Sequence, residues 1–234
     1  AGNTGALMAL ARYILKMLPG IDRPAICSMM PGLERHTHVL DLGANVDPSS
    51  EQLFQYAVMG SELTSAVDNV KDPTVALLNV GAEEIKGNDR VKQAAILLSE
   101  SHLNYVGFVE GNDIYAGKVD VVVCDGFSGN IALKASEGVA TLFSAHAKKV
   151  FRGSTYGKLA AMISRPVLKT IQEKIDPRRY NGASLLGLKG IVVKSHGGAD
   201  SLSFANAIEE AMKEVSKNVP ERISERLEEL LIEG

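Results

Sequence analysis

The sequence predicts an α/β protein with a mainly parallel sheet covered by helices on both faces. Short β-rich runs alternate with helical patterns along the chain, and the run at 74–80 reads as a fully buried strand. The length of 234 residues suits one large domain of this class, and we expect residues 1–234 to form a single domain. Hydrophobic residues make up 45% and charged residues 23%, which is typical of an ordinary globular protein.

The chain opens with AGNTG, which runs directly into an amphipathic helical pattern that ends at Pro19-Gly20. A glycine-rich loop of this kind normally receives its chain from a strand. No strand pattern precedes the loop, and there is no initiator methionine. We therefore expect an amino-terminal portion to be missing.

The remaining elements follow from periodicity and from β-branched content. Strands are predicted at 25–30, 37–42, 74–80, 105–109, 119–124 and 191–194. Helices are predicted at 49–67, 88–101, 131–151, 201–219 and 221–233, the last of these restarting after a proline. Residues 148–179 are predicted to form a basic amphipathic helical element that follows the helix at 131–151.

Composition excludes several classes of protein. Cys27 and Cys124 each lie in a strand-like apolar run, so a disulfide framework is not expected and a reducing cytoplasm fits best. There is no GxGxxG after a strand and no GxxxxGK[ST], which argues against a dinucleotide or ATP site. Aromatic residues make up only 5%, which disfavours stacking on single-stranded nucleic acid. We expect no nucleic-acid partner and no cofactor.

The net charge of −3 conceals an asymmetry. The segment from Lys148 to Arg179 has nine basic residues and two acidic ones, so it carries +7 and the remainder carries −10. A local excess of this kind indicates an anionic partner or surface, whereas a solvated helical face is the alternative.

Four loops that follow predicted strands mix glycine with polar residues. They read LDLGANVD (40–47), LLNVGAEEIKG (77–87), VCDGFSGN (123–130) and VKSHGGAD (193–200). In an open parallel sheet the carboxyl ends of the strands share one edge, which is the usual ligand crevice. Glycine allows close backbone approach, and helix amino termini present N–H groups to anions. Together with the GNTG loop, the four loops predict a phosphate-handling site.

Each candidate residue has a plain structural alternative. Lys86 could offer its ammonium group to phosphate or to an oxyanion, or could simply be solvated. Asn130 could hydrogen-bond a carbonyl or phosphate, or could cap a helix. His196 could act as a general acid or base, or could be a loop histidine. Asp41 and Asp125 could orient partners, or could only satisfy loop N–H groups.

The other candidates are interpreted as structural. Asp47 is a helix-cap candidate, and Cys124 is interpreted as a buried thiol rather than a nucleophile. Four histidines show no ligand spacing with cysteines or acids, so no metal site is expected. These histidines are His36, His38, His102 and His146.

The motifs, taken in order, resemble one family. AGNTGALMA, VLDLGANVD, LLNVGAEEIKG, VCDGFSGN and YNGASLLGLKGIVVKSHG are similar in sequence and spacing to the acyl-ACP:phosphate acyltransferases known as PlsX. The resemblance covers essentially the whole chain, but the family's amino-terminal section of about a hundred residues has no counterpart here. It implies a three-layer α/β/α sandwich related to the isocitrate and isopropylmalate dehydrogenases and to phosphotransacetylase.

The resemblance also implies a function. The expected enzyme forms acyl-phosphate from long-chain acyl-[acyl carrier protein] and inorganic phosphate, for use by a glycerol-3-phosphate acyltransferase in phospholipid synthesis. A cytoplasmic homodimer is implied, associated peripherally with the inner face of the membrane through the 148–179 element. That element combines basic residues with an apolar face, as interfacial helices do. Core or dimer packing and docking of the acidic carrier protein are alternatives for the same surface.

Roles follow from this hypothesis. Gly2, Asn3, Thr4 and Gly5 would cradle phosphate at a helix start. Lys86 would neutralise the phosphate, and Asn130 would bind the thioester carbonyl or fix the phosphate. Other residues of the loops would complete the site, with Asp125 and His196 as further catalytic candidates and Asp41, Asn45 and Gly129 as binding candidates.

Three other functions remain open from the sequence. A short-chain phosphotransacylase would use CoA thioesters on the same fold. A non-catalytic fragment that binds a membrane or a partner would explain the missing strand before Ala1. A dehydrogenase is the third alternative, although no nicotinamide fingerprint is present.

Overall fold

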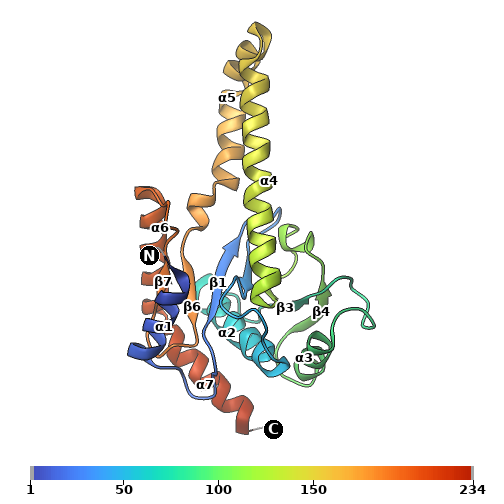
Figure 1. Ribbon diagram of the computed structural model, residues 1–234, viewed down its shortest axis with the longest axis vertical. Coiled ribbons are helices and arrows are strands. Elements are labelled where there is room, and N and C mark those ends of the chain that lie inside the picture. The colour runs from blue at the N-terminus through green and yellow to red at the C-terminus, as the bar shows by residue number, and fades with distance from the viewer. Residues whose placement is uncertain (1–2, 233–234) are drawn as a thin grey trace. The chain divides into compact units, whose positions relative to one another are not determined.

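A computed structural model of the chain describes residues 3–232, apart from five side chains (Gln172, Ile175, Pro177, Leu231 and Ile232). The chain divides into two units (Figure 1). The sheet unit comprises Ala1–Asn130 and Arg178–Gly234, and the hairpin unit comprises Ile131–Pro177.

Seven strands form one mixed sheet in the order β4-β3-β5-β2-β1-β6-β7. Their bounds are Ala25–Met30 (β1), Thr37–Leu40 (β2), Val75–Leu78 (β3), Tyr105–Val109 (β4), Val121–Val123 (β5), Ala183–Leu186 (β6) and Val193–Lys194 (β7). β2, β3, β4, β5 and β6 run in one direction, whereas β1 and β7 run in the other. The predicted mainly parallel sheet is therefore confirmed, but β6 was not predicted and the β1-β6-β7 side is antiparallel.

Helices flank this sheet. Their bounds in the sheet unit are Thr4–Leu15 (α1), Ser50–Asp68 (α2), Asp89–Ser99 (α3), Ser201–Ser216 (α6) and Val219–Ile232 (α7), with short 3-10 turns at Asp113–Tyr115 and Pro177–Tyr180. α2 packs against β2, β5, α3 and α7, so it is the central helix of its layer. Its start is a capping box in which Ser49 and Gln52 each accept from the other's backbone N–H.

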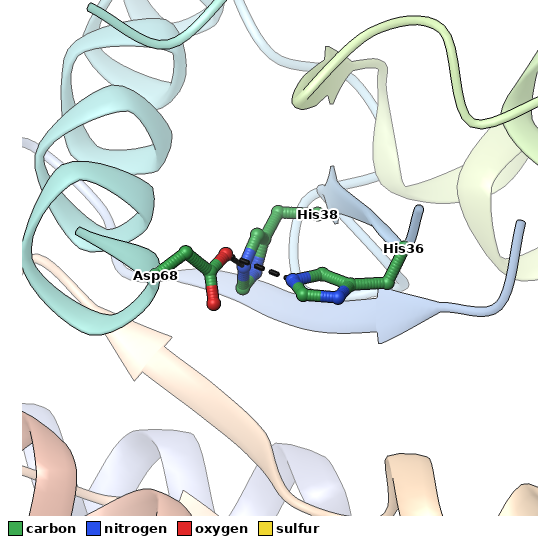
Figure 2. Close-up of side chains that lie close together, drawn as sticks. All are labelled: His36, His38 and Asp68. Atoms are coloured by element: carbon green, nitrogen blue, oxygen red, sulfur yellow. Dashed lines mark hydrogen bonds and ion pairs between the residues drawn. The ribbon is translucent and has the colours of Figure 1, made fainter. Parts of the chain in front are cut away.

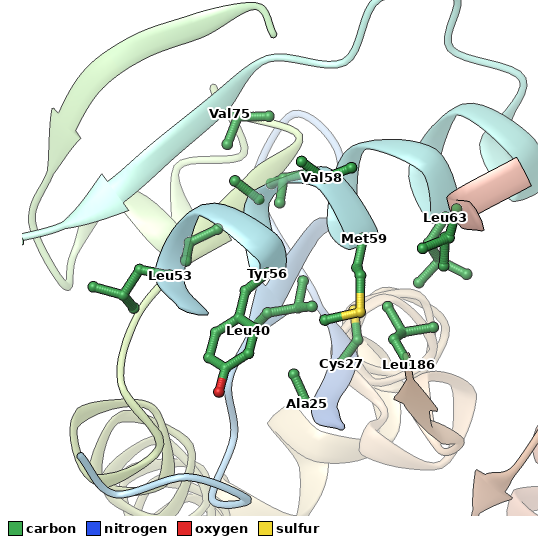
Figure 3. Close-up of a cluster of buried hydrophobic side chains, with 14 of the residues drawn as sticks. Ala25, Cys27, Leu40, Leu53, Tyr56, Val58, Met59, Leu63, Val75 and Leu186 are labelled. Carbon is green, nitrogen blue, oxygen red and sulfur yellow. The ribbon is translucent and has the colours of Figure 1, made fainter. Parts of the chain in front are cut away.

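The main core lies between the sheet and α2 (Figure 3). It contains Leu40, Tyr56, Met59 and Leu63, which are all almost completely buried. These side chains come from β2 and from the sheet-facing side of α2, as the apolar pattern predicts. Both cysteines are free and buried, as expected from the sequence.

The hairpin unit consists of most of α4 (Gly126–Arg152) followed by α5 (Thr155–Ile175). Ser154 caps α5 by accepting from the Gly157 N–H. Many apolar side chains of both helices are exposed, including those of Phe143 and Ile163. Within the described residues, no helix is long and apolar enough to cross a bilayer.

α6 covers the antiparallel side of the sheet and buries a carboxyl group. The Glu214 side chain accepts a hydrogen bond from the Ser184 hydroxyl of β6. Burial raises the pKa of Glu214 to about 7, because water no longer stabilises the charged form, and the nearby Glu210 raises it further. The folded chain therefore holds this carboxyl group protonated below neutral pH.

This burial predicts a pH dependence of stability. The folded pKa of Glu214, about 7, lies above its ordinary value of 4.5. Its contribution to stability is therefore fully present below pH 4.5 and is lost as the pH rises through 7. Replacement of Glu214 by Gln should flatten this decline, measured by urea unfolding across the pH range. Replacement of the exposed Glu209 of the same helix by Gln should leave the decline as in the parent, and an unchanged slope for Glu214→Gln would contradict the prediction.

Candidate active site

Three of the four predicted loops lie at one edge of the sheet. β3, β5 and β2 are consecutive and parallel, so the loops that leave their carboxyl ends are neighbours. These loops are LLNVGAEEIKG, VCDGFSGN and LDLGANVD. The expected shared edge is therefore present for this group, which we call the carboxyl edge.

Asp41 organises the loop after β2. One carboxylate oxygen accepts from the backbone N–H groups of Ile26 and Ala44, each at 3.0 Å, and the other accepts from the Asn45 N–H at 2.6 Å. The Asn45 side-chain amide donates to the same carboxylate and to the Pro24 carbonyl. Burial raises the pKa of Asp41, although these donors oppose the shift. Asp41 and Asn45 therefore fix the backbone conformation of the loop after β2 through buried hydrogen bonds.

The loop after β5 packs tightly on the loop after β2. The Gly126 N–H donates to the Asn45 carbonyl at 2.8 Å. A Cβ atom on Gly129 would lie 2.0 Å from the Asp41 carbonyl oxygen, so only glycine fits there. The buried Cys124 thiol donates to that same carbonyl, and burial raises its pKa. Cys124 is thus held as a neutral structural group.

α4 begins at Gly126 rather than at the predicted 131. Asp125 caps it, because its carboxylate accepts from both the N–H and the hydroxyl of Ser128. Asn130 consequently lies in the second turn, and the expectation that it caps a helix is wrong. It is exposed and lies against Gly43, where a Cβ atom would be 3.5 Å from the Cβ atom of Asn130. Among the described residues, nothing hydrogen-bonds its amide.

Lys86 lies in the loop after β3 at the same edge. It is exposed and forms an ion pair with Glu83 at 2.8 Å, which raises the pKa of Lys86 and keeps it cationic. The acid three residues earlier in the sequence is a signal of this pairing that sequence reasoning missed. A second ion pair, between Arg90 and Asp47, ties the start of α3 to the loop after β2, so Asp47 is a partner of Arg90 and the cap of α2 is Ser49.

The Asn3 turn lies elsewhere, which corrects the expectation of one common pocket. Asn3 caps its own helix by accepting from the Ala6 N–H, and Thr4 and Gly5 begin α1. Leu7, one turn on, lies beside β7. β7 and β3 are five positions apart in the sheet, roughly 24 Å at ~4.8 Å per strand. Asn3 and Lys86 therefore cannot contact one phosphate within a single chain. Gly2, a further candidate for this turn, lies outside the described residues.

His196 is also separate from the carboxyl edge. It follows β7, which runs opposite to β2, β3 and β5, so its loop leaves the other edge of the sheet. The backbone N–H of His196 donates to Asn181, and its Nδ1 atom accepts from the Gly198 N–H at 3.1 Å. The expectation that all four loops share one edge is wrong for this loop, because strand direction is not encoded in local sequence.

Two histidines do have an acidic partner, contrary to the sequence expectation. His36 and His38 both hydrogen-bond the same Asp68 carboxylate oxygen (Figure 2). Burial raises the pKa of Asp68, but the two imidazoles outweigh it and hold that pKa well below the ordinary value. The Asp68 hydrogen bond in turn raises the pKa of His36. Folding joins residues thirty positions apart, which no local spacing reveals.

Two exposed side-chain donors lie in the loops of the carboxyl edge, and one of them, Lys86, is paired with Glu83. Three N–H groups at the start of α4 are engaged: that of Gly126 by Asn45, and those of Ser128 and Gly129 by Asp125. The Asn130 amide and the Lys86 ammonium group remain as exposed donors. Asn130 is a neutral donor and Lys86 a cationic one, which are the kinds of group that bind an anion or a polarised carbonyl.

A solved structure of related shape defines the class of fold. The branched-chain phosphotransacylase of Enterococcus faecalis V583 matches with a TM-score of 0.57 and 13% identity, over 91% of this chain and 70% of that one. The chain is therefore an α/β protein with the fold of the phosphotransacylases.

Sequence relatives identify the family. A family model described as "Fatty acid synthesis protein" matches residues 1–222. The phosphate acyltransferase of Nitrosococcus oceani is 60% identical, and that of Methylococcus capsulatus is 61% identical, each over 212 residues. The chain belongs to the family of this model, the fatty acid synthesis proteins, and is similar to these two phosphate acyltransferases. The matched region is 91% of this chain and 62% of each relative, so the chain spans about three-fifths of their length.

Substitution of Gly129 tests the close contact between the loop after β5 and the loop after β2. Replacement of Gly129 by Ala places a Cβ atom against the Asp41 carbonyl and the Cys124 sulfur, and overpacking of this kind costs about 1–3 kcal/mol of unfolding free energy. Gly138 of the same helix has open space around it, so Gly138→Ala should be neutral or stabilising by up to ~1 kcal/mol. Urea unfolding measures both. Equal stabilities of the two variants would contradict the close packing.

Proposed function

We propose that the chain contributes the carboxyl-edge site of an enzyme that forms acyl-phosphate from long-chain acyl-[acyl carrier protein] and inorganic phosphate. Its family and the names of its relatives support the phosphate acyltransferase activity. The observation that carries the proposal is the position of Asn130, an unengaged amide held over Gly43 by two interlocked loops. The long-chain acyl carrier protein substrate rests on the motif resemblance.

The reaction sets clear requirements. A phosphate oxygen attacks the thioester carbonyl carbon, a C–O bond forms, and the C–S bond breaks as the thiolate leaves and takes up a proton. Because phosphate is already anionic near neutral pH, a strong general base is less necessary. The protein must hold both reactants in line and offset the charge that develops on the carbonyl oxygen.

Few groups of the carboxyl edge carry the proposed chemistry. Asn130 donates its amide N–H to the thioester carbonyl or fixes the phosphate, and the Lys86 ammonium group neutralises the phosphate. Asp125 positions Asn130 by capping α4, and Asp41 with Asn45 holds the opposing loop. These last three act through backbone geometry, since their polar atoms are already engaged within the chain.

Asn3, Thr4, Gly5 and His196 have no place in this site within one chain, because they lie on the β7 side of the sheet. A homodimer is part of the proposal on the family resemblance. The product would pass to a glycerol-3-phosphate acyltransferase in phospholipid synthesis.

Two substitutions test the chemistry. Lys86→Ala and Asn130→Ala should each lower turnover at least about a hundredfold, because loss of one donor to a developing oxyanion typically costs ~10²–10³. Acyl-phosphate formation is measured with this chain joined to the amino-terminal section of a relative, beside the exposed-lysine control Lys71→Ala, which should retain parent activity. Circular dichroism checks the fold. Near-normal turnover in either site variant rejects that residue's role.

A short-chain phosphotransacylase that uses CoA thioesters is the second candidate within the same fold. Donor preference separates the two: equal or faster turnover with acetyl-CoA than with palmitoyl-[acyl carrier protein] favours the CoA enzyme. A non-catalytic fragment is the third candidate. This third candidate is supported if this chain alone forms no acyl-phosphate while the chain joined to a relative's amino-terminal section does.

We further propose that the 148–179 element binds the anionic membrane surface. α5 exposes apolar side chains throughout, with Met162 at 67% and Ile163 at 70% exposed, beside the basic residues of the same segment. An interfacial helix needs this combination. Peripheral association with the inner face of the membrane follows if the element inserts its apolar face.

Vesicle binding tests this element. Met162→Ser with Ile163→Ser should weaken binding to phosphatidylglycerol-rich vesicles at least about tenfold, because each replacement removes apolar burial of about 1.5–3 kcal/mol. The matched pair Ile208→Ser with Met212→Ser changes exposed residues of α6 and should bind like the parent. Added salt should weaken parent binding. Cosedimentation that is unaffected by salt and by the first pair contradicts the proposal.

A further inference from the structure

A cluster of three ionisable side chains lies at the edge opposite the carboxyl edge. His36 immediately precedes β2, His38 lies within β2, and Asp68 is the last residue of α2 (Figure 2). The three side chains converge from the strand and from the helix end toward one point. No step of the proposed acyl transfer involves them.

The donor atoms are already gathered. The Nε2 atoms of His36 and His38 each lie 2.8 Å from the same Asp68 carboxylate oxygen. One ligand atom of each residue lies within 4.8 Å of the others. In a tetrahedral zinc site, bonds of ~2.0–2.1 Å put neighbouring ligand atoms about 3.3 Å apart. Each of the two Nε2-to-Asp68 distances would therefore lengthen by only about half an ångström around an ion.

The surroundings favour a cation. The carboxyl end of α2 carries the partial negative charge of the helix dipole, and the helix's own last turn has no basic side chain, although Lys217 donates to the side chain of the cap residue Asn69 at 3.0 Å. The His38 Nδ1 atom faces the Cys27 sulfur at 3.8 Å, which supplies a partner for the second ring nitrogen, as metal-bound histidines usually have. The His38 side chain is 1% exposed and that of His36 is 35% exposed. One ligand of the cluster is therefore buried, and solvent reaches the cluster at His36.

We propose that His36, His38 and Asp68 form a binding site for a divalent transition-metal ion of the zinc type. Two imidazoles and one carboxylate suit Zn²⁺, Co²⁺ and Ni²⁺, whereas Mg²⁺ and Ca²⁺ prefer oxygen ligands alone. Each Nε2 atom would offer its lone pair to the ion, so each neutral ring would carry its single proton on Nδ1, and any proton on Nε2 would leave to solvent. Water reaches the remaining coordination positions from the exposed side of His36.

The site is structural in its consequence. α2 has 19 residues and is about 28 Å long, and it begins at the carboxyl edge and ends at Asp68. An ion there is too far from Asn130 to take part in acyl transfer. It instead fastens the start of β2 to the end of the central helix, and so stabilises the folded chain by mass action.

Cobalt and zinc titrations of the chelator-treated chain test the site. Co²⁺ should produce visible d–d absorption at one ion per chain, and Zn²⁺ should displace it. Zn²⁺ should also raise the midpoint of thermal unfolding. His36→Gln and Asp68→Asn keep hydrogen-bonding groups and should each weaken Zn²⁺ binding at least about tenfold by calorimetry, since even loss of an outer-shell partner costs ~10–100-fold.

His146→Gln is the matched control, because His146 is an exposed histidine of α4 outside the cluster. It should leave the affinity unchanged. The test uses His36→Gln and Asp68→Asn and leaves His38 unchanged, because replacement of this buried side chain could unfold the chain. Absence of saturable binding in the parent chain overturns the proposal. So does parent-like affinity in both His36→Gln and Asp68→Asn.

Discussion

The buried carboxylate of Asp41 is the constraint on which the candidate active site depends. It joins three backbone N–H groups from two segments, Ile26 of β1 and the Ala44–Asn45 turn. A carboxylate buried without such donors would be very costly, so the turn can only adopt the shape that supplies them. That shape sets where the Asp41 carbonyl points, and this carbonyl is the surface on which the loop after β5 rests.

The second loop is determined by the first. Gly126 and Gly129 are the positions at which α4 approaches the β2 loop, and the closeness of their backbones leaves no room for a side chain. Cys124 fills the remaining space as a neutral thiol bonded to the same carbonyl. Asn130 is therefore directed toward Gly43 by backbone contacts rather than by hydrogen bonds of its own. An amide placed in this way stays free for a ligand, which is the condition a binding group must meet.

Most of the elements could be predicted from the sequence, because hydrophobic periodicity and β-branched runs are local properties. β6 could not, since Ala183–Leu186 lies between Gly182 and Gly187 in a stretch that resembles a loop. The grouping of Asp41, Asn45, Asp125 and Asn130 was predicted correctly from the rule that parallel strands share a carboxyl edge. The rule failed for His196 because β7 is antiparallel to its neighbour, and strand direction is decided by long-range pairing.

The two ends of α2 show how the same residue types acquire different roles. At its start, Ser49 and Gln52 satisfy the free N–H groups within the helix itself, so nothing further is required there. At its end, Asp68 places a negative charge at the negative pole of the helix dipole, an arrangement that costs roughly 0.3–1 kcal/mol at an exposed site. The arrangement persists because His38 of β2 and His36, which immediately precedes that strand, both hydrogen-bond that carboxylate. A helix end that is unfavourable alone is thus stabilised by the side chains that hydrogen-bond its last carboxylate, and in the proposed site a metal ion takes over that role.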